Sequence, residues 1–111
     1  MLPDVFGALA NPTRRHMLDS LRGSPRTAGE LTATLNLSRS TASEHLSILR
    51  QAGLVLEERQ GRHRVYRLQA EGLAEVSAWL KRYEQYWEER LDALGELLDA
   101  SDPAPEQGEH P

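Results

Sequence analysis

The amino-acid sequence predicts a mainly α-helical (α+β) domain with about five helices and one two-stranded β-hairpin. Two short capped helices joined by a tight turn fit residues 27–52. Strand-like alternation replaces helical spacing from Leu54, and a long apolar stripe at helical spacing follows in residues 71–100. We expect one domain over residues 1–100. Residues 101–111 are polar, acidic and Pro-rich, and we expect them to be a disordered tail.

Residues 2–22 predict the first two helices. A short amphipathic helix fits residues 2–10, and a second fits residues 12–22. Asn11 suits the N-cap of the second helix, Pro12 its first position, and Gly23 its end. The apolar positions expected in these two helices are Val5, Phe6, Leu9, Met17, Leu18 and Leu21.

Residues 27–52 have the pattern of a helix-turn-helix. Thr27 and Glu30 match a capping box, which starts a helix that ends near Leu35. Ser38 suits the N-cap of the next helix, and Gly53 its end. That helix has an apolar stripe of Ala42, Leu46 and Leu49 under a polar face. Such a helix can stay docked on its domain while it enters the DNA major groove.

The segments LVLEERQ and RHRVYRL follow directly, around Gln60, Gly61 and Arg62. Two short strand-like segments around a glycine predict a hairpin. Its tip is basic, with Arg59, Arg62, His63 and Arg64. A hairpin after a DNA-reading helix is a wing, so the predicted fold is a winged helix-turn-helix.

Residues 71–100 predict one long helix. Its apolar residues recur at spacings of three and four, and the remaining positions are strongly charged. About 30 residues span roughly 45 Å, which is longer than a small domain. We therefore expect the same helix of a second chain to cover its far half. The aromatic residues of this helix favour dimer packing, with a ligand pocket as the alternative.

Composition limits the classes of function. The net charge is −4, but residues 1–70 hold ten arginines against six acidic residues, and residues 71–111 hold three basic residues against eleven acidic ones. The basic part can face phosphate, and the acidic part then faces away from it. With no Cys, disulfides and thiolate metal sites are excluded. No catalytic constellation is present, so we expect no enzyme. No long apolar run or signal peptide is evident, so we expect a cytoplasmic protein without a membrane partner.

The segments FGALANPTRRHMLDSL, AGELTATLNLSRSTASEHLSILRQAGLV and ERQGRHRVYRL resemble the ArsR-type winged helix-turn-helix transcriptional repressors of bacteria. The resemblance covers roughly residues 4–98. It implies a homodimer with the first and last helices at the interface, and two recognition helices in successive major grooves of double-stranded DNA. It also implies a repressor that acts on an inverted-repeat operator, with regulation of its own promoter expected.

The metal sites of this family are not carried over. Its founding members hold metal with Cys pairs in the helix before the recognition helix, and the matching segment TAGELTATL has neither Cys nor His. Other members use His and acidic residues on the last helix, where this chain has no His. We therefore expect no metal site and no cofactor, and the inducer stays unknown.

Ten residues are the candidate DNA contacts. Arg39 suits guanine O6 and N7, and Glu44 suits cytosine N4. His45 has two alternatives, a half-buried structural or phosphate-bonding role and base readout. Arg62 and Arg64 on the wing suit minor-groove or flanking phosphates. The full set is Ser38, Arg39, Ser40, Thr41, Ser43, Glu44, His45, Arg62, His63 and Arg64.

The expected dimer interface combines the first and last helices, as the resemblance implies. Its residues are Val5, Phe6, Leu9, Trp79, Leu80, Tyr83, Trp87, Leu91 and Leu94. Two other functions stay open. One is a winged-helix module for protein interaction without a specific DNA site. The other is a metal-responsive repressor that uses carboxylates and His of the last helix and tail.

Overall fold

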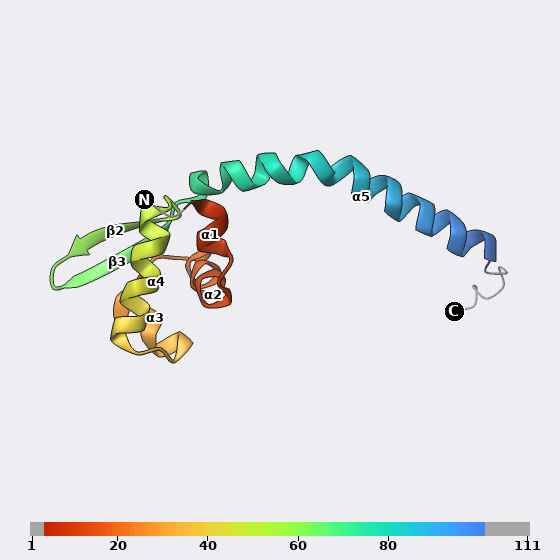
Figure 1. Cartoon of the computed structure of the whole chain (residues 1–111). Helices are drawn as coiled ribbons and strands as arrows, with labels where there is room; N and C mark the ends of the chain where they lie inside the picture. Colours follow the sequence, from red (N-terminus) through yellow and green to blue (C-terminus); the bar gives the residue numbers. More distant parts are fainter. Residues whose placement is uncertain (1–3, 102–111) are drawn as a thin grey trace. The chain divides into compact units, whose positions relative to one another are not determined.

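The structure is a computed structural model that describes residues 4–101. It confirms the predicted fold class, with helices dominant and a β-hairpin between the fourth helix and the last (Figure 1). The elements are α1 (Val5–Leu9), α2 (Pro12–Leu21), β1 (Arg26–Thr27), α3 (Ala28–Leu35), α4 (Arg39–Gln51), β2 (Val55–Gln60), β3 (His63–Leu68), the 3-10 helix η1 (Ala70–Leu73) and α5 (Ala74–Ser101). The predicted tail, apart from Ser101, lies outside the described residues.

The caps expected from the sequence begin the helices. The Asn11 side chain accepts from the Arg14 amide at 3.1 Å, with Pro12 at the first position of α2. Thr27 and Glu30 form a complete capping box on α3. Ser38 Oγ accepts from the Thr41 amide at 3.1 Å and so begins α4. Each cap satisfies an amide that the helix itself leaves without a partner.

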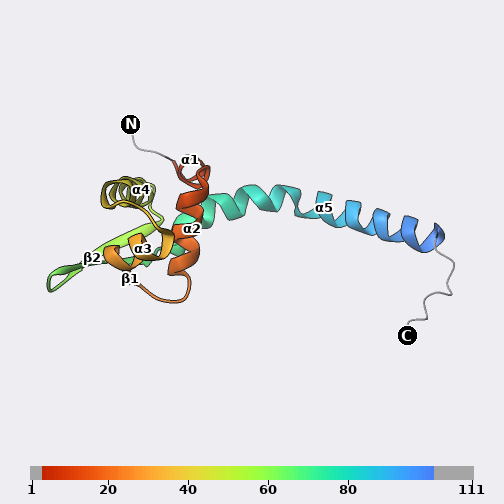
Figure 2. The same ribbon diagram turned by 90° about the horizontal axis from the view of Figure 1, so that it is seen from below.

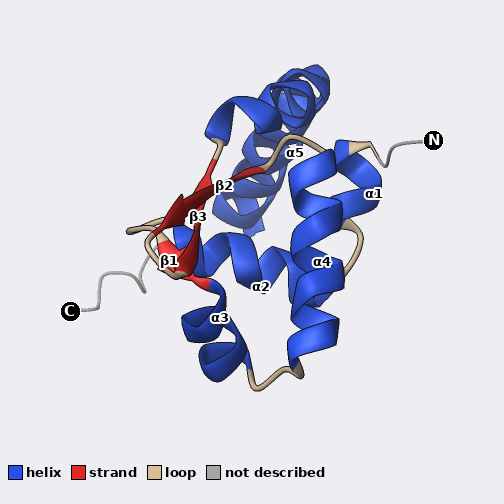
Figure 3. Ribbon diagram, turned by 90° about the vertical axis from the view of Figure 1, so that its left-hand side faces the viewer, coloured by secondary structure: helices blue, strands red, loops and turns tan. Residues whose placement is uncertain are grey.

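One apolar core joins α1 to α4 with the sheet. Helix α2 contacts α1, α3, α4 and β3, so it lies at the centre of this arrangement (Figure 3). The predicted inward residues Met17 and Leu18 of α2 and the α4 stripe are all buried. Burial of this stripe fixes which face of α4 remains outward. Among these core residues, the largest fully buried side chains are Met17, Leu31, Leu46, Leu49, Leu54 and Val55.

The predicted hairpin is part of a three-stranded antiparallel sheet in the order β1-β3-β2. The third strand, β1, pairs Arg26 with Tyr66 and Thr27 with Val65. The sequence indicated only a turn at Arg26, because a two-residue strand has no periodicity to detect. Both views show the β2–β3 tip projecting beyond α3 and α4 (Figures 1 and 2).

A close backbone contact joins the end of α4 to η1. Gly53 adopts a positive φ of 82° just past Ala52, the C-cap of α4, and a Cβ on Gly72 would overlap the Gly53 carbonyl oxygen. The Gln69 amide donates to the Leu54 carbonyl at 2.8 Å beside this contact. The chain that follows α4 and the chain that precedes α5 are therefore fixed to each other through two glycines.

Contacts divide the chain into two units, one that ends at Val76 and one that begins at Ser77. The second unit contains most of α5, where many large apolar side chains are exposed. No helix of the described residues combines the length and the apolar character needed to cross a bilayer. The expectation of one domain over residues 1–100 stays a prediction.

Candidate nucleic-acid interface

Helix α4 presents its polar residues in two strips, one on the flank beside the wing and one opposite the core. Arg39, Ser43 and Arg50 lie on the side of the wing, and Ser40 and Glu44 lie farther round the helix, as 3.6 residues per turn requires. All five are exposed. The side chains expected to read bases are thus available to a partner, and they face two directions rather than one.

A hollow of about 620 Å³ lies between the start of α3, the first half of α4 and the wing. It brings together five of the predicted contacts: Arg39, Ser43, Arg62, His63 and Arg64. Its other lining residues include Thr27 of β1, Gly29 and Thr32 of α3, and Ala42, Leu46 and Tyr66. Three arginines around an apolar base suit an extended polyanion, since guanidinium groups bind phosphate and the base can contact a sugar.

Ser38 and Thr41 are engaged at the start of α4. Ser38 Oγ donates to Thr41 Oγ1 at 2.8 Å while it accepts from the Thr41 amide. The Ser38 hydroxyl proton is therefore used within the cap. Of these two predicted contacts, Thr41 retains a hydroxyl proton for a phosphate.

His45 lies half-buried on the flank of α4 that faces α1 and α2. Its Nδ1 is 3.2 Å from Nη1 of Arg14. A guanidinium only donates, so Nδ1 must accept and the proton of a neutral ring sits on Nε2. Sequence reasoning missed Arg14, because the two residues are 31 positions apart and meet only in the folded chain.

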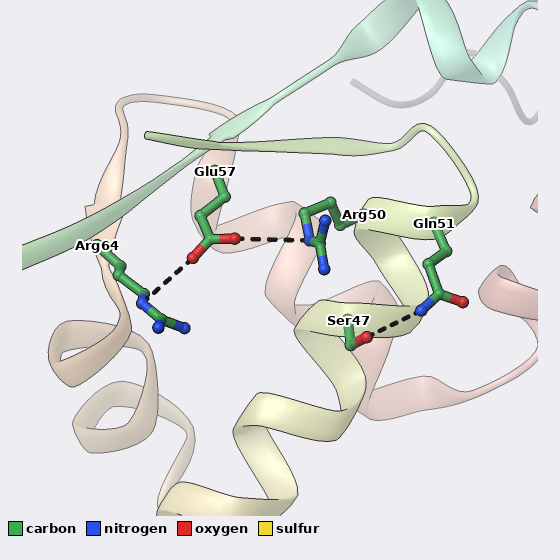
Figure 4. Close-up of polar contacts among 5 residues, drawn as sticks. All are labelled: Ser47, Arg50, Gln51, Glu57 and Arg64. Carbon is green, nitrogen blue, oxygen red and sulfur yellow. Dashed lines mark hydrogen bonds and ion pairs between the residues drawn. The ribbon is translucent and has the colours of Figure 1, made fainter. Parts of the chain in front are cut away.

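Glu57 of β2 connects α4 to the wing (Figure 4). Its Oε1 lies 3.6 Å from Nε of Arg50, and its Oε2 lies 3.4 Å from Nε of Arg64. In the same view, Gln51 donates to Ser47 at 3.2 Å on a neighbouring strip of α4. Sequence reasoning missed the bridging role of Glu57. Charge alone gave no signal, because Glu58 beside it is the same residue type on the other face of the strand.

Tyr66 lies at the base of the hollow, opposite Glu57 in the strand register. Burial raises the pKa of its phenol above the usual value of 10.0, and the Glu57 carboxylate raises it further. The Arg64 guanidinium acts in the opposite direction. The phenol therefore remains protonated at the foot of the arginine cluster, where it can donate a hydrogen bond.

Among the residues that the structure describes, no group of three or more His, Cys, Asp or Glu is placed to hold a metal ion.

In α5, considered by itself, the predicted interface residues are exposed. Their exposed fractions range from 42% for Tyr83 to 62% for Leu91. Trp79 packs on Tyr83 with ring centroids 5.2 Å apart, and Arg90 lies 4.7 Å from the Tyr86 ring centroid. Tyr86, Leu97 and Leu98 are similarly exposed but were not in the predicted set.

Helix α1 gives a different result for one residue. Val5 is only 4% exposed and belongs to the core of its own chain, whereas Phe6 and Leu9 are half-buried. Val5 has little surface left for a partner, because the first turn of α1 packs against the other helices. Of the three α1 residues expected at a dimer interface, only Phe6 and Leu9 can contribute.

Comparison with known proteins gives consistent relatives. Residues 11–56 match the family described as "Bacterial regulatory protein, arsR family". The chain is 36% identical over 80 residues to the transcriptional repressor SdpR of Bacillus subtilis, covering 72% of this chain and 89% of SdpR. It is 38% identical over 99 residues to the HTH-type transcriptional regulator Rv2034 of Mycobacterium tuberculosis, covering 88% and 90%.

A solved structure has the same fold. The NMR structure of the homodimeric winged helix-turn-helix DNA-binding domain Mb0332 from Mycobacterium bovis, described as a possible ArsR-family transcriptional regulator, superimposes with a TM-score of 0.58 at 31% identity. The match covers 70% of this chain and 72% of that one.

Proposed function

The chain belongs to the ArsR family of bacterial regulatory proteins, and from this premise we propose that it is a homodimeric repressor of an inverted-repeat operator. The family consists of transcriptional regulators with a DNA-binding winged helix-turn-helix, not of enzymes. We further propose that the protein acts in the cytoplasm and represses its own promoter.

The observation that carries the proposal is the arginine-lined hollow between α4 and the wing. Arg39 enters it from the recognition helix, and Arg62 and Arg64 enter it from the hairpin. Arg39 lies where a helix in the major groove presents its first residues to base edges. The wing arginines are exposed and suit the phosphates beside that groove.

The repressor role is supported by SdpR, a relative named as a transcriptional repressor. The homodimer is supported by Mb0332, whose domain is described as homodimeric, and by the exposed apolar side chains of α5. Two copies of α4 related by a two-fold axis would read two half-sites about one DNA turn apart, which requires an inverted repeat.

The test begins with the purified protein and sheared DNA of its own source. The retained fragments are sequenced, and the enriched site is measured by fluorescence anisotropy against a scrambled site over a series of salt concentrations. We expect a symmetric site, preferred over the scrambled one, with affinity that falls steeply as salt rises. Affinity that depends on neither sequence nor salt would instead favour a protein-interaction module.

Added Zn²⁺ or Ni²⁺ tests the metal-responsive alternative in the same assay. We expect operator affinity to be the same with and without the metal. Release of the operator by low micromolar metal would favour the alternative.

A further inference from the structure

We propose that Glu57 is a positioning residue that holds Arg50 of α4 and Arg64 of β3 as a clamp for one phosphodiester of DNA. The inference rests on the proposed function and adds Arg50 and Glu57 to the residues that act in it. The clamp spans the recognition helix and the wing.

The geometry assigns one carboxylate oxygen to each arginine. Oε1 faces Arg50 and Oε2 faces Arg64, and the closest atom of each guanidinium is Nε. A guanidinium has five N–H groups, of which Nε carries one. The dashed contacts in Figure 4 run from Glu57 to Nε of each arginine, and none is drawn to a terminal nitrogen. The terminal nitrogens of the two exposed arginines can bind a phosphate.

The Glu57 side chain is less exposed than the two arginines that it contacts, as expected of a residue that positions them. The Glu57 side chain is 26% exposed, whereas Arg50 is 50% and Arg64 57% exposed. The carboxylate is thus the inner member and the guanidinium groups are the outer ones. A ligand from solvent meets the arginines first.

Positive charge exceeds negative charge around Glu57. Arg64 lies directly across the hairpin from Arg59, on the same face of the sheet as Glu57. Like charges in opposed positions of an antiparallel pair destabilise it. Glu57 contacts two arginines, Arg59 lies on the same face of the sheet, and the Tyr66 phenol opposite Glu57 is neutral. A phosphodiester supplies the missing negative charge, so this cluster is complementary to a nucleic-acid backbone.

Glu57 has a competing interpretation, in which it occupies the arginines and keeps DNA away. The separations of 3.4 and 3.6 Å exceed the 2.7–2.9 Å typical of strong charge-assisted hydrogen bonds. Pairs of this kind on exposed side chains are weak. A phosphate bound through the terminal nitrogens need not displace Glu57, so the carboxylate orients the arginines without blocking them.

The same hairpin contains a matched control. Glu58 pairs with Arg67 at 2.9 Å on the opposite face of the sheet, and both side chains are 45% exposed. This pair has the same residue types, sits one position along the strand and lies on the face of the sheet opposite to Glu57. Loss of a negative charge is equal in Glu57→Gln and Glu58→Gln, so only a positioning role separates them.

The experiment measures operator affinity of the full chain by anisotropy over a salt series, with the site that the parent protein retains. We expect Glu57→Gln to weaken binding roughly threefold to tenfold. Removal of a negative charge near DNA would by itself strengthen binding, so a loss of affinity points to the positioning role. We expect Glu58→Gln to change the affinity less than about twofold. We expect Arg50→Gln to lower the slope of log K against log salt by about 0.9, the value for one phosphate.

The effect of Glu57→Gln should vanish in a variant that already carries Arg50→Gln and Arg64→Gln. Tighter or unchanged binding by Glu57→Gln, or an equal loss in Glu58→Gln, would overturn the positioning role while the operator binding of the parent stands. If the parent binds no DNA in a salt-dependent way, the proposed function and this inference fail together. Thermal unfolding of each variant shows whether its fold is retained.

Discussion

Arg14 joins the first helix of the domain to the recognition helix through His45. Its Nη1 lies 3.2 Å from His45 Nδ1, while Nε donates to the Ala8 carbonyl at 2.7 Å and Nη2 to the Gly7 carbonyl at 3.2 Å. One side chain on α2 thus satisfies the end of α1 and orients a ring on α4. The Nε2–H of His45 then remains as a donor, which fits a phosphate-bonding role better than base readout.

Replacing Arg14 should therefore destabilise the domain. Arg14→Ala removes three side-chain contacts, two of them partly buried and one exposed, and we expect it to lower the free energy of unfolding by about 1–3 kcal/mol. Arg15→Ala is the control, because Arg15 has one exposed hydrogen bond, to the Leu9 carbonyl at 2.7 Å. Urea unfolding followed by circular dichroism measures both, and equal losses would show that Arg14 has no linking role.

Arg39 and Arg62 should differ in what they contribute to DNA binding. We expect Arg39→Ala to relax specificity at one base position per half-site, since a bidentate contact to guanine discriminates by about 1–3 kcal/mol. We expect Arg62→Ala to weaken operator and random DNA alike and to reduce the salt slope. Anisotropy with a panel of single-base variants separates the two. If Arg39→Ala bound every variant as the parent does, its base-reading role would be wrong.

A charge in the apolar stripe of α5 should prevent self-association. Leu91 is 62% exposed, and Leu91→Glu would place a carboxylate in the expected interface, where burial of an unpaired charge is costly. We expect sedimentation velocity to report a monomer and operator affinity to fall with it. Asp92→Ala is the control, because the next residue lies about 100° around the helix. A dimer that persists in Leu91→Glu would place the interface elsewhere.

A methyl group at Gly72 should disturb the joint between α4 and η1. Its Cβ would overlap a backbone oxygen, which cannot move aside as the end of a flexible side chain could. We therefore expect Gly72→Ala to lower the free energy of unfolding by about 1–3 kcal/mol. A Cβ at Gly95 in α5 meets nothing within 4 Å, and Gly95→Ala should be neutral or stabilising. Thermal melts of the two variants decide, and unchanged stability in Gly72→Ala would contradict the close approach.

Tyr66 should give the domain a dependence on alkaline pH. Burial, and then the Glu57 carboxylate, raise the pKa of its phenol in the folded chain above 10.0. The folded state therefore holds this proton more tightly than the unfolded state does. The resulting stability is complete below pH 10 and is lost as the pH rises through the raised pKa. Urea unfolding at pH 8–11.5 should show a steeper decline for the parent than for Tyr66→Phe, and parallel curves would rule the effect out.

The order of the helices and strands could be predicted from the sequence because the signals that start them are local. Asn11, Thr27 and Ser38 begin their helices through hydrogen bonds that span only three residues, and these bonds form as expected. The apolar stripe of α4 is also local, since side chains three and four apart share a face of a helix. The exposed polar face of α4 followed from that stripe, because burying one face leaves the other outward.

The tertiary structure alone decided which side chains act together. Helical or strand periodicity does not predict three pairs that meet in the fold: Arg14 with His45, Glu57 with Arg64, and Gly53 with Gly72. Residue type did not distinguish Glu57 from Glu58, yet the register of β2 on β3 sends one towards α4 and the other to the opposite face. The sequence by itself determined the helices, the β2–β3 hairpin and the polar face of α4. Packing of α4 against the sheet determined the bridge from Glu57 to Arg50 and Arg64, because such a bridge depends on which residues the fold brings within a few ångströms.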